Sequence, residues 1–190
     1  MADSALIERY GFGMSDASAW DALEAGVAHG PPTWEASLKI EILLEELGER
    51  STGLVYSERD RGFHMLGSVG GYSSAVLNDL NLEVNEDGRV IEVWGYSPRE
   101  SWIDGVVQLP EGARRGALRL LQEFTPGVSR RMGGNGAWLV TFDANANVIR
   151  YALNVQEPPA VLVEFLDGCI AGLDRKHELV SLWLQPEMIP

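Results

Sequence analysis

Residues 81–94, with the sequence Asn-Leu-Glu-Val-Asn-Glu-Asp-Gly-Arg-Val-Ile-Glu-Val-Trp, decide the fold class. Apolar and polar residues alternate on both sides of Asp87-Gly88, and this pair is typical of a two-residue β-turn because glycine tolerates positive φ. The stretch therefore predicts an antiparallel hairpin. The predicted cross-strand pairs are Leu82 with Val93, Val84 with Ile91, Glu83 with Glu92 and Glu86 with Arg89.

The face of this hairpin opposite Leu82 and Val93 is predicted to carry Val90, Trp94 and Tyr96, since side chains alternate along a strand. Outward from the hairpin, other segments rich in β-branched and aromatic residues also predict strands. These segments are 54–56, 63–66, 103–109 and a second hairpin of 137–142 with 148–153, whereas 179–184 fits either a strand or a helix.

Four segments carry apolar residues at helical spacing and predict helices over 15–29, 33–47, 110–124 and 160–173. Together with the hairpins they predict an α+β fold, in which a mostly antiparallel sheet built from hairpins has helices packed against it. We expect residues 1–190 to form a single domain, because no segment resembles a linker. Residues 185–190 are expected to be a C-terminal tail.

The 190 residues carry a formal net charge of −13. A field of this sign repels nucleic-acid phosphates and anionic lipids, so we expect neither a nucleic acid nor a membrane as partner. A basic protein is the partner that this charge favours. The sequence shows no export signal and no apolar run long enough to span a bilayer, which predicts a soluble, cytoplasmic protein.

The sequence contains one cysteine and three histidines. Cys169 lies among apolar residues and is interpreted as part of the core. The histidines do not show metal-ligand spacing, and we recognise no catalytic motif. We therefore expect no metal and no cofactor, and the sequence favours a binding protein over an enzyme.

Two segments are candidates for contact with a protein partner. Glu41, Glu45 and Glu49 recur every four residues along the predicted helix 33–47 and just beyond it, which predicts a negative face. The segment 94–102 combines aromatic residues with an arginine, the residue types enriched in binding hot spots. Its candidate contact residues are Trp94, Tyr96, Arg99 and Trp102.

The alternatives are a small-anion site and a homo-oligomer. Arg130 and Arg131 precede the glycine-rich residues 133–136, and paired guanidinium groups next to a flexible loop suit a carboxylate or a phosphate. Such a site would belong to a small-anion-binding protein or an enzyme. The six tryptophans could instead form the interface of a structural homo-oligomer.

In general character, a small acidic protein without a catalytic signature resembles the bacterial immunity proteins, which occlude the basic active site of a toxin. This resemblance covers no motif. It implies a non-catalytic protein-binding module, and this is the function that the sequence favours.

Overall fold

The structure is a computed structural model, and it describes residues 38–43, 52–67, 70–132, 138–153 and 158–190. Every described residue belongs to one compact unit, Thr33–Pro190. The helix predicted over 15–29 lies outside the described residues.

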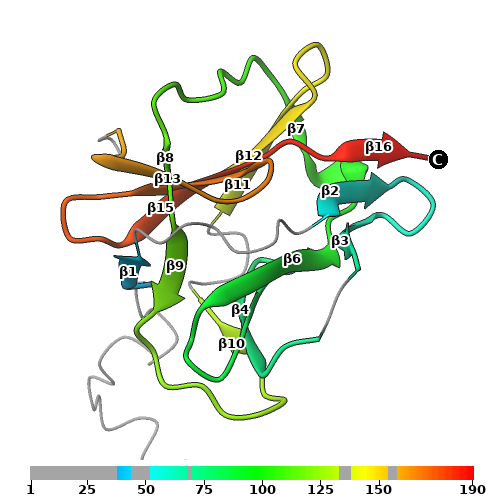
Figure 1. Ribbon diagram of the computed structural model, residues 1–190. Helices are drawn as coiled ribbons and strands as arrows, with labels where there is room; N and C mark the ends of the chain where they lie inside the picture. Colours follow the sequence, from blue (N-terminus) through cyan, green and yellow to red (C-terminus); the bar gives the residue numbers. More distant parts are fainter. Residues whose placement is uncertain (1–37, 44–51, 68–69, 133–137, 154–157) are drawn as a thin grey trace, which may run out of the picture. The chain divides into compact units, whose positions relative to one another are not determined.

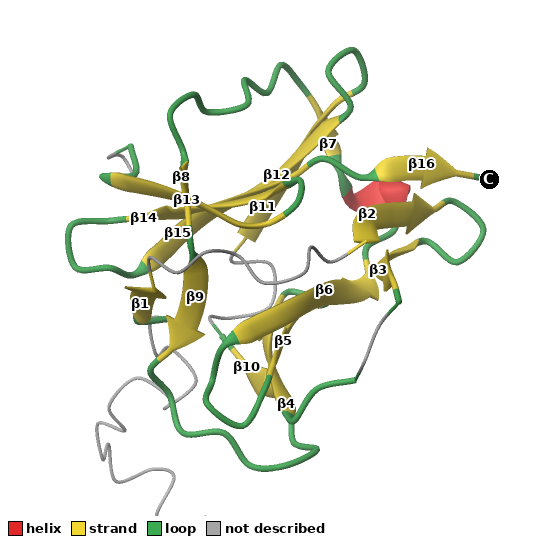
Figure 2. Ribbon diagram, in the orientation of Figure 1, coloured by secondary structure: helices red, strands yellow, loops and turns green. Residues whose placement is uncertain are grey.

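The described residues form three β-sheets (Figures 1 and 2). The first seven-stranded sheet, here called sheet I, has the strand order β10-β4-β5-β6-β3-β2-β16. Its strands are β10 (Arg130–Arg131), β4 (Ser73–Leu77), β5 (Leu80–Val84), β6 (Val90–Tyr96), β3 (Gly62–Leu66), β2 (Thr52–Ser57) and β16 (Glu187–Ile189).

The second seven-stranded sheet, sheet II, has the order β7-β11-β12-β15-β14-β13-β8. Its strands are β7 (Ile103–Asp104), β11 (Trp138–Asp143), β12 (Val148–Leu153), β15 (Leu179–Leu184), β14 (Cys169–Leu173), β13 (Val161–Leu166) and β8 (Arg114–Arg115). The third sheet pairs β1 (Ile40–Leu43) with β9 (Ala117–Leu120).

The prediction of an α+β fold is wrong, because the structure is nearly all β. Among the described residues, the single helical segment is the 3₁₀ turn Arg99–Ser101, drawn red in Figure 2. The predicted helix 160–173 is the hairpin of β13 and β14, which turns at Asp167-Gly168. Gly168 has a φ of 74°, so the turn needs glycine there.

The other two predicted helices also become strands where they are described. The segment 110–124 contains β8 and β9, and Leu118 and Leu120 of β9 are buried with the polar Arg119 between them. Within 33–47 the described part holds β1, whose four residues pair with β9. These segments form strands because they pair with segments that are distant in the sequence. The local spacing of their apolar residues does not reveal this pairing.

The hairpin of β5 and β6 is confirmed, with Leu82 opposite Val93 and Glu83 opposite Glu92. The predicted pair of Glu86 with Arg89 is wrong, because the backbone N–H of Asn85 donates to the carbonyl of Arg89. A β-bulge after Glu83 then shifts the register, so that Val84 pairs with Val90 instead of Ile91. The extra residue turns Val90 into the core, where it is 3% exposed. The prediction that Val90 shares a face with Trp94 is therefore wrong.

The second hairpin, β11 with β12, is confirmed, and residues 179–184 form the strand β15. The predicted strand 103–109 is reduced to β7. Residues 187–189 of the expected tail form β16, which pairs in parallel with β2.

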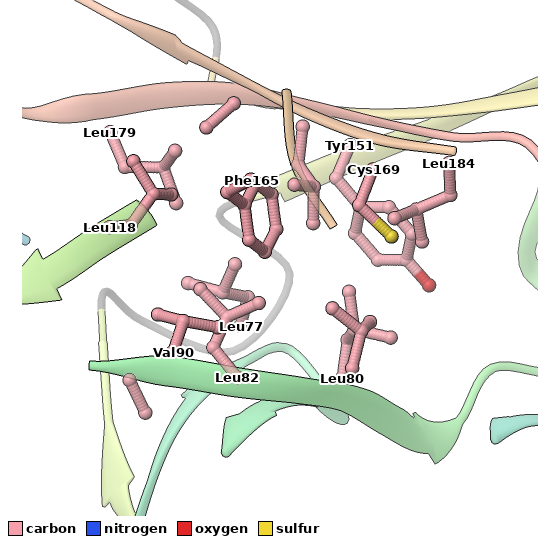
Figure 3. Packing of buried hydrophobic residues seen from close by; sticks show 14 of the residues in the cluster. Leu77, Leu80, Leu82, Val90, Leu118, Tyr151, Phe165, Cys169, Leu179 and Leu184 are labelled. Carbon is pink, nitrogen blue, oxygen red and sulfur yellow. The ribbon is translucent and has the colours of Figure 1, made fainter. Parts of the chain in front are cut away.

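A continuous apolar core lies between the facing sides of sheets I and II (Figure 3). Leu80 and Leu82 of sheet I and Phe165 and Leu184 of sheet II point into it, and each is at most 2% exposed. Cys169 is also fully buried there, which confirms its prediction as a core residue, and burial raises the pKa of its thiol.

Residues 105–113, here called the strap, connect β7 at one edge of sheet II to β8 at the opposite edge (Figure 1). Val107 of the strap packs with Val148, Ile170 and Trp183 in a second, smaller apolar cluster. These three residues alternate with core residues along their strands, so they lie on the outer face of sheet II. The strap therefore covers part of that face.

Candidate functional site

The outer face of β6 carries two exposed aromatic rings. Val93 and Gly95 are buried toward the core, whereas Trp94 and Tyr96 alternate with them and are 40% and 51% exposed. The predicted placement of both rings on one face of the hairpin is therefore confirmed. Trp94, Tyr96 and the neighbouring Glu83 are here called the aromatic face.

Polar contacts hold both rings. The indole Nε1 of Trp94 donates a hydrogen bond of 2.7 Å to Oε2 of Glu83. The side chain of Tyr96 lies next to the guanidinium of Arg61, and its interaction with this group, followed by the charge of Glu100, raises the pKa of Arg61. Arg61 also forms an ion pair of 3.2 Å with Glu100. The exposed ring of Trp94 is thus held next to a carboxylate, and that of Tyr96 lies next to a guanidinium that is itself paired with a carboxylate.

Trp102, in contrast, is 6% exposed and belongs to the core. Its ring packs against Tyr56, Phe63 and Phe142, with centroid distances of 4.8, 6.1 and 5.3 Å. Its Nε1 donates to Oγ of Ser97 at 2.9 Å. This residue cannot serve as a partner contact in the folded state.

Arg99 lies over the same aromatic cluster. Its guanidinium carbon is 5.5 Å from the ring centroid of Trp102 and 4.7 Å from that of Phe142, and it pairs with Asp104. These contacts use the cation to cover the end of the core. Of the four predicted residues in 94–102, only Trp94 and Tyr96 are thus brought together on one surface.

The predicted acidic helical face is not present where the structure describes it. Glu41 belongs to strand β1 and forms an ion pair of 3.0 Å with Arg119 on the neighbouring strand β9. Glu45 and Glu49 lie outside the described residues. Glu41 is therefore a neutralised residue of a strand pair.

A second feature is an open pocket of about 440 Å³ at the β10 edge of sheet I. Both predicted anion-binding residues, Arg130 and Arg131, line it. The remaining lining residues are Glu123, Phe124, Thr125, Val128 and Ser129.

The two arginines differ in their contacts. Arg131 donates a hydrogen bond to the backbone carbonyl of Asn78 and lies 3.6 Å from a carboxylate oxygen of Asp79. The exposed side chain of Arg130 has no hydrogen bond or ion pair with another residue in the described part of the chain. One guanidinium is thus oriented by the protein, and the other is available to a ligand.

Within the described ranges, histidine, cysteine and carboxylate side chains form no group of three that would hold a metal ion. The same ranges contain no helix with the length and apolar character that a membrane span requires.

Sequence reasoning missed Glu83, Arg61, Thr125 and Ser129. The first had a usable signal, because the predicted register places Glu83 two residues from Asn81, which pairs with Trp94, and therefore on the same face of the hairpin as Trp94. The other three gain their positions from contacts with distant segments, for which a single sequence gives no signal.

No protein-family model matches this chain, and no curated protein matches it.

Proposed function

We propose that this protein is a cytoplasmic, non-catalytic module that binds a basic protein partner through the aromatic face. The observation that carries the proposal is the exposure of Trp94 and Tyr96 side by side on β6, with both rings held by polar neighbours. Tryptophan and tyrosine contribute large contact areas at low entropic cost when their positions are fixed in advance.

Charge defines the partner. The protein carries a net charge of −13, and the carboxylate of Glu83 lies next to the ring of Trp94. A lysine or arginine of the partner can stack on the ring of Trp94 while it approaches the carboxylate of Glu83. A basic enzyme or toxin site, such as the one that bacterial immunity proteins occlude, has this chemistry.

The first test is affinity capture from the native cell with the unmodified protein and with the double variant Trp94→Ser, Tyr96→Ser. We expect the partner to be basic and to be lost from the double variant. The matched control is Leu139→Ser, which removes another half-exposed apolar side chain from β11 of sheet II. Equal capture by all three proteins would contradict the proposal.

With the purified partner, the single substitution Trp94→Ala should weaken binding by about tenfold to a hundredfold, the range of a hot-spot residue. The association rate constant should fall by about tenfold or more between low salt and about 1 M salt, because ions screen the attraction between the two charges. If neither the substitution nor the salt concentration alters binding, the complex does not form through the aromatic face.

The same variant tests the homo-oligomer alternative. If the aromatic face joined two copies of this chain, the unmodified protein would sediment as a dimer and the double variant as a monomer. The proposal predicts instead that both sediment as monomers when no partner is present.

A further inference from the structure

The walls of the pocket at the β10 edge are fixed by hydrogen bonds to β4 and the residue before it. In the turn 125–128, the backbone N–H of Gly127 donates to the carbonyl of Tyr72 at 2.8 Å, and Oγ of Ser73 donates to the carbonyl of Val128 at 2.6 Å. The hydroxyls of Ser74 and Ser129 are hydrogen-bonded at 2.8 Å. The pocket is therefore formed before any ligand arrives, which lowers the entropic cost of binding.

The turn itself is suited to a permanent shape. Val128 N–H donates to the carbonyl of Thr125 at 3.0 Å, and Pro126 fixes the chain at the second position. Gly127 follows with a φ of 69°, the conformation that the third position of a type II turn requires. Thr125, at the first position of this turn, and Ser129, directly after its last position, both line the pocket.

The hydrogen-bond donors at the pocket favour a phosphate group. The guanidinium of Arg130 has no partner among the residues that the structure describes, and Arg131 adds a second guanidinium that its contact with the carbonyl of Asn78 holds in place. Two carboxylates, Glu123 in the wall and Asp79 beside Arg131, oppose an anion. A phosphate monoester presents three acceptor oxygens to the two guanidinium groups, whereas a carboxylate presents two, so the phosphate can accept more hydrogen bonds to offset this repulsion.

The size and lining favour an organic ligand over a bare ion. The volume of about 440 Å³ falls in the range of small-molecule sites, roughly 300–1,000 Å³. The apolar side chains of Phe124 and Val128 line the pocket beside the arginines, and Val128 is 54% exposed. Apolar atoms of a ligand, next to its anionic group, can pack against these two side chains.

We propose that this pocket binds the phosphate monoester group of a small organic molecule, with Arg130 as the principal contact and Arg131 as the second. The site is independent of the proposed protein-binding function, because β4 and β5 separate β10 from β6 in sheet I.

The test is calorimetric titration of the full chain with phenyl phosphate near neutral pH. We expect saturable binding that Arg130→Ala weakens by about tenfold, the usual effect of removing a charged hydrogen-bond donor. Glu123→Gln should tighten binding, because it removes a negative charge from the wall. The matched control Arg59→Ala also removes one exposed arginine, but from the turn between β2 and β3, and should leave binding unchanged.

Three ligands separate the possible sources of the signal. Phenyl phosphate should bind more tightly than inorganic phosphate, and both more tightly than benzoate. Equal binding of phenyl phosphate and benzoate would overturn the assignment to a phosphate group. Equal binding of the two phosphates would overturn the claim that the pocket also contacts the organic group of the ligand. The absence of saturable binding, or binding that Arg130→Ala leaves unchanged, would overturn the site.

A readout without substitution guards against a variant that does not fold. On titration with phenyl phosphate, the backbone amide resonances of Thr125, Ser129 and Arg130 should shift in the unmodified protein, and unshifted resonances would contradict the proposal. The double variant Trp94→Ser, Tyr96→Ser should bind phenyl phosphate normally, so failure of one proposal does not imply failure of the other.

Discussion

Gly88 occupies the turn between β5 and β6 with a φ of 77°. A Cβ at this position would lie 2.7 Å from the backbone oxygen of Leu120, whose N–H donates to the carbonyl of Gly88. Gly88→Ala therefore combines backbone strain with a clash that backbone atoms cannot easily relieve. We expect it to lower the free energy of unfolding by about 2 to 4 kcal/mol in urea denaturation.

Gly112→Ala is the matched control for this prediction. Gly112 has nearly the same φ, 75°, but a Cβ there would meet nothing within 4 Å. Its expected cost is the strain alone, about 1 kcal/mol. Equal costs at the two glycines would show that the contact between the turn and Leu120 is not tight.

The carboxylate of Asp143 holds both the strap and the turn between β11 and β12 by hydrogen bonds. Its oxygens accept hydrogen bonds from the backbone N–H groups of Val107, Ala146 and Asn145, and these bonds, the one from Val107 most of all, lower its pKa below the ordinary 3.8. Because the pKa of Asp143 is lower in the folded state, the carboxylate stabilises the fold at any pH above its ordinary pKa. This stabilisation is lost as the pH falls through the pKa of the folded state.

Asp143→Asn should therefore be less stable than the unmodified protein at neutral pH, and the difference should shrink as the pH falls below about 4. Urea denaturation at several pH values between neutral and strongly acidic conditions measures this. A difference that stays constant over the whole range would show that the charge of Asp143 contributes nothing.

At the scale of elements, the strap allows a sharp comparison between adjacent valines. Val107 is 5% exposed and packs on Trp183, whereas Val106 is 86% exposed. We expect Val107→Ala to cost about 2 kcal/mol of unfolding free energy and Val106→Ala to cost almost nothing. Urea denaturation of both variants checks this, and similar values would mean that the strap does not depend on its apolar cluster.

The sequence predicts elements well where alternation and turn residues agree. In residues 81–94 the alternating pattern and Asp87-Gly88 indicate the same hairpin, and the structure confirms it. In 160–173 almost every residue is apolar, so the run fits a helix as well as a strand. The turn residues Asp167-Gly168 are the signal that distinguishes the observed hairpin from the predicted helix. The bulge beside Glu83 had no local signal and moved Val90 to the other face.

The candidate sites were predictable in the same uneven way. Alternation alone placed Trp94 and Tyr96 on one face of the hairpin. Residue type suggested Arg130 and Arg131, but the rest of their pocket depends on contacts between segments more than 50 residues apart. The burial of Trp102 likewise requires rings from β2, β3 and β11, which no local pattern brings together.

At the scale of the whole unit Thr33–Pro190, the core between the two seven-stranded sheets is one continuous cluster. Neither sheet can lose its partner without exposing the buried leucines of its inner face, so we expect the two sheets to unfold together. Tryptophan fluorescence and far-ultraviolet circular dichroism should give coincident urea transitions. Two separated transitions would show that the sheets are stable independently.

The parallel pairing of β2 with β16 has a consequence for the time course of refolding. Residues 55–57 find their partners at 187–189, and between them the chain traverses both sheets. Closing so large a loop costs conformational entropy before the contact contributes any stabilisation. Domains dominated by such remote pairings reach the native state in roughly milliseconds to seconds. After dilution from urea this protein should therefore belong with the slow β-folders, and a microsecond phase that restores native fluorescence would contradict that expectation.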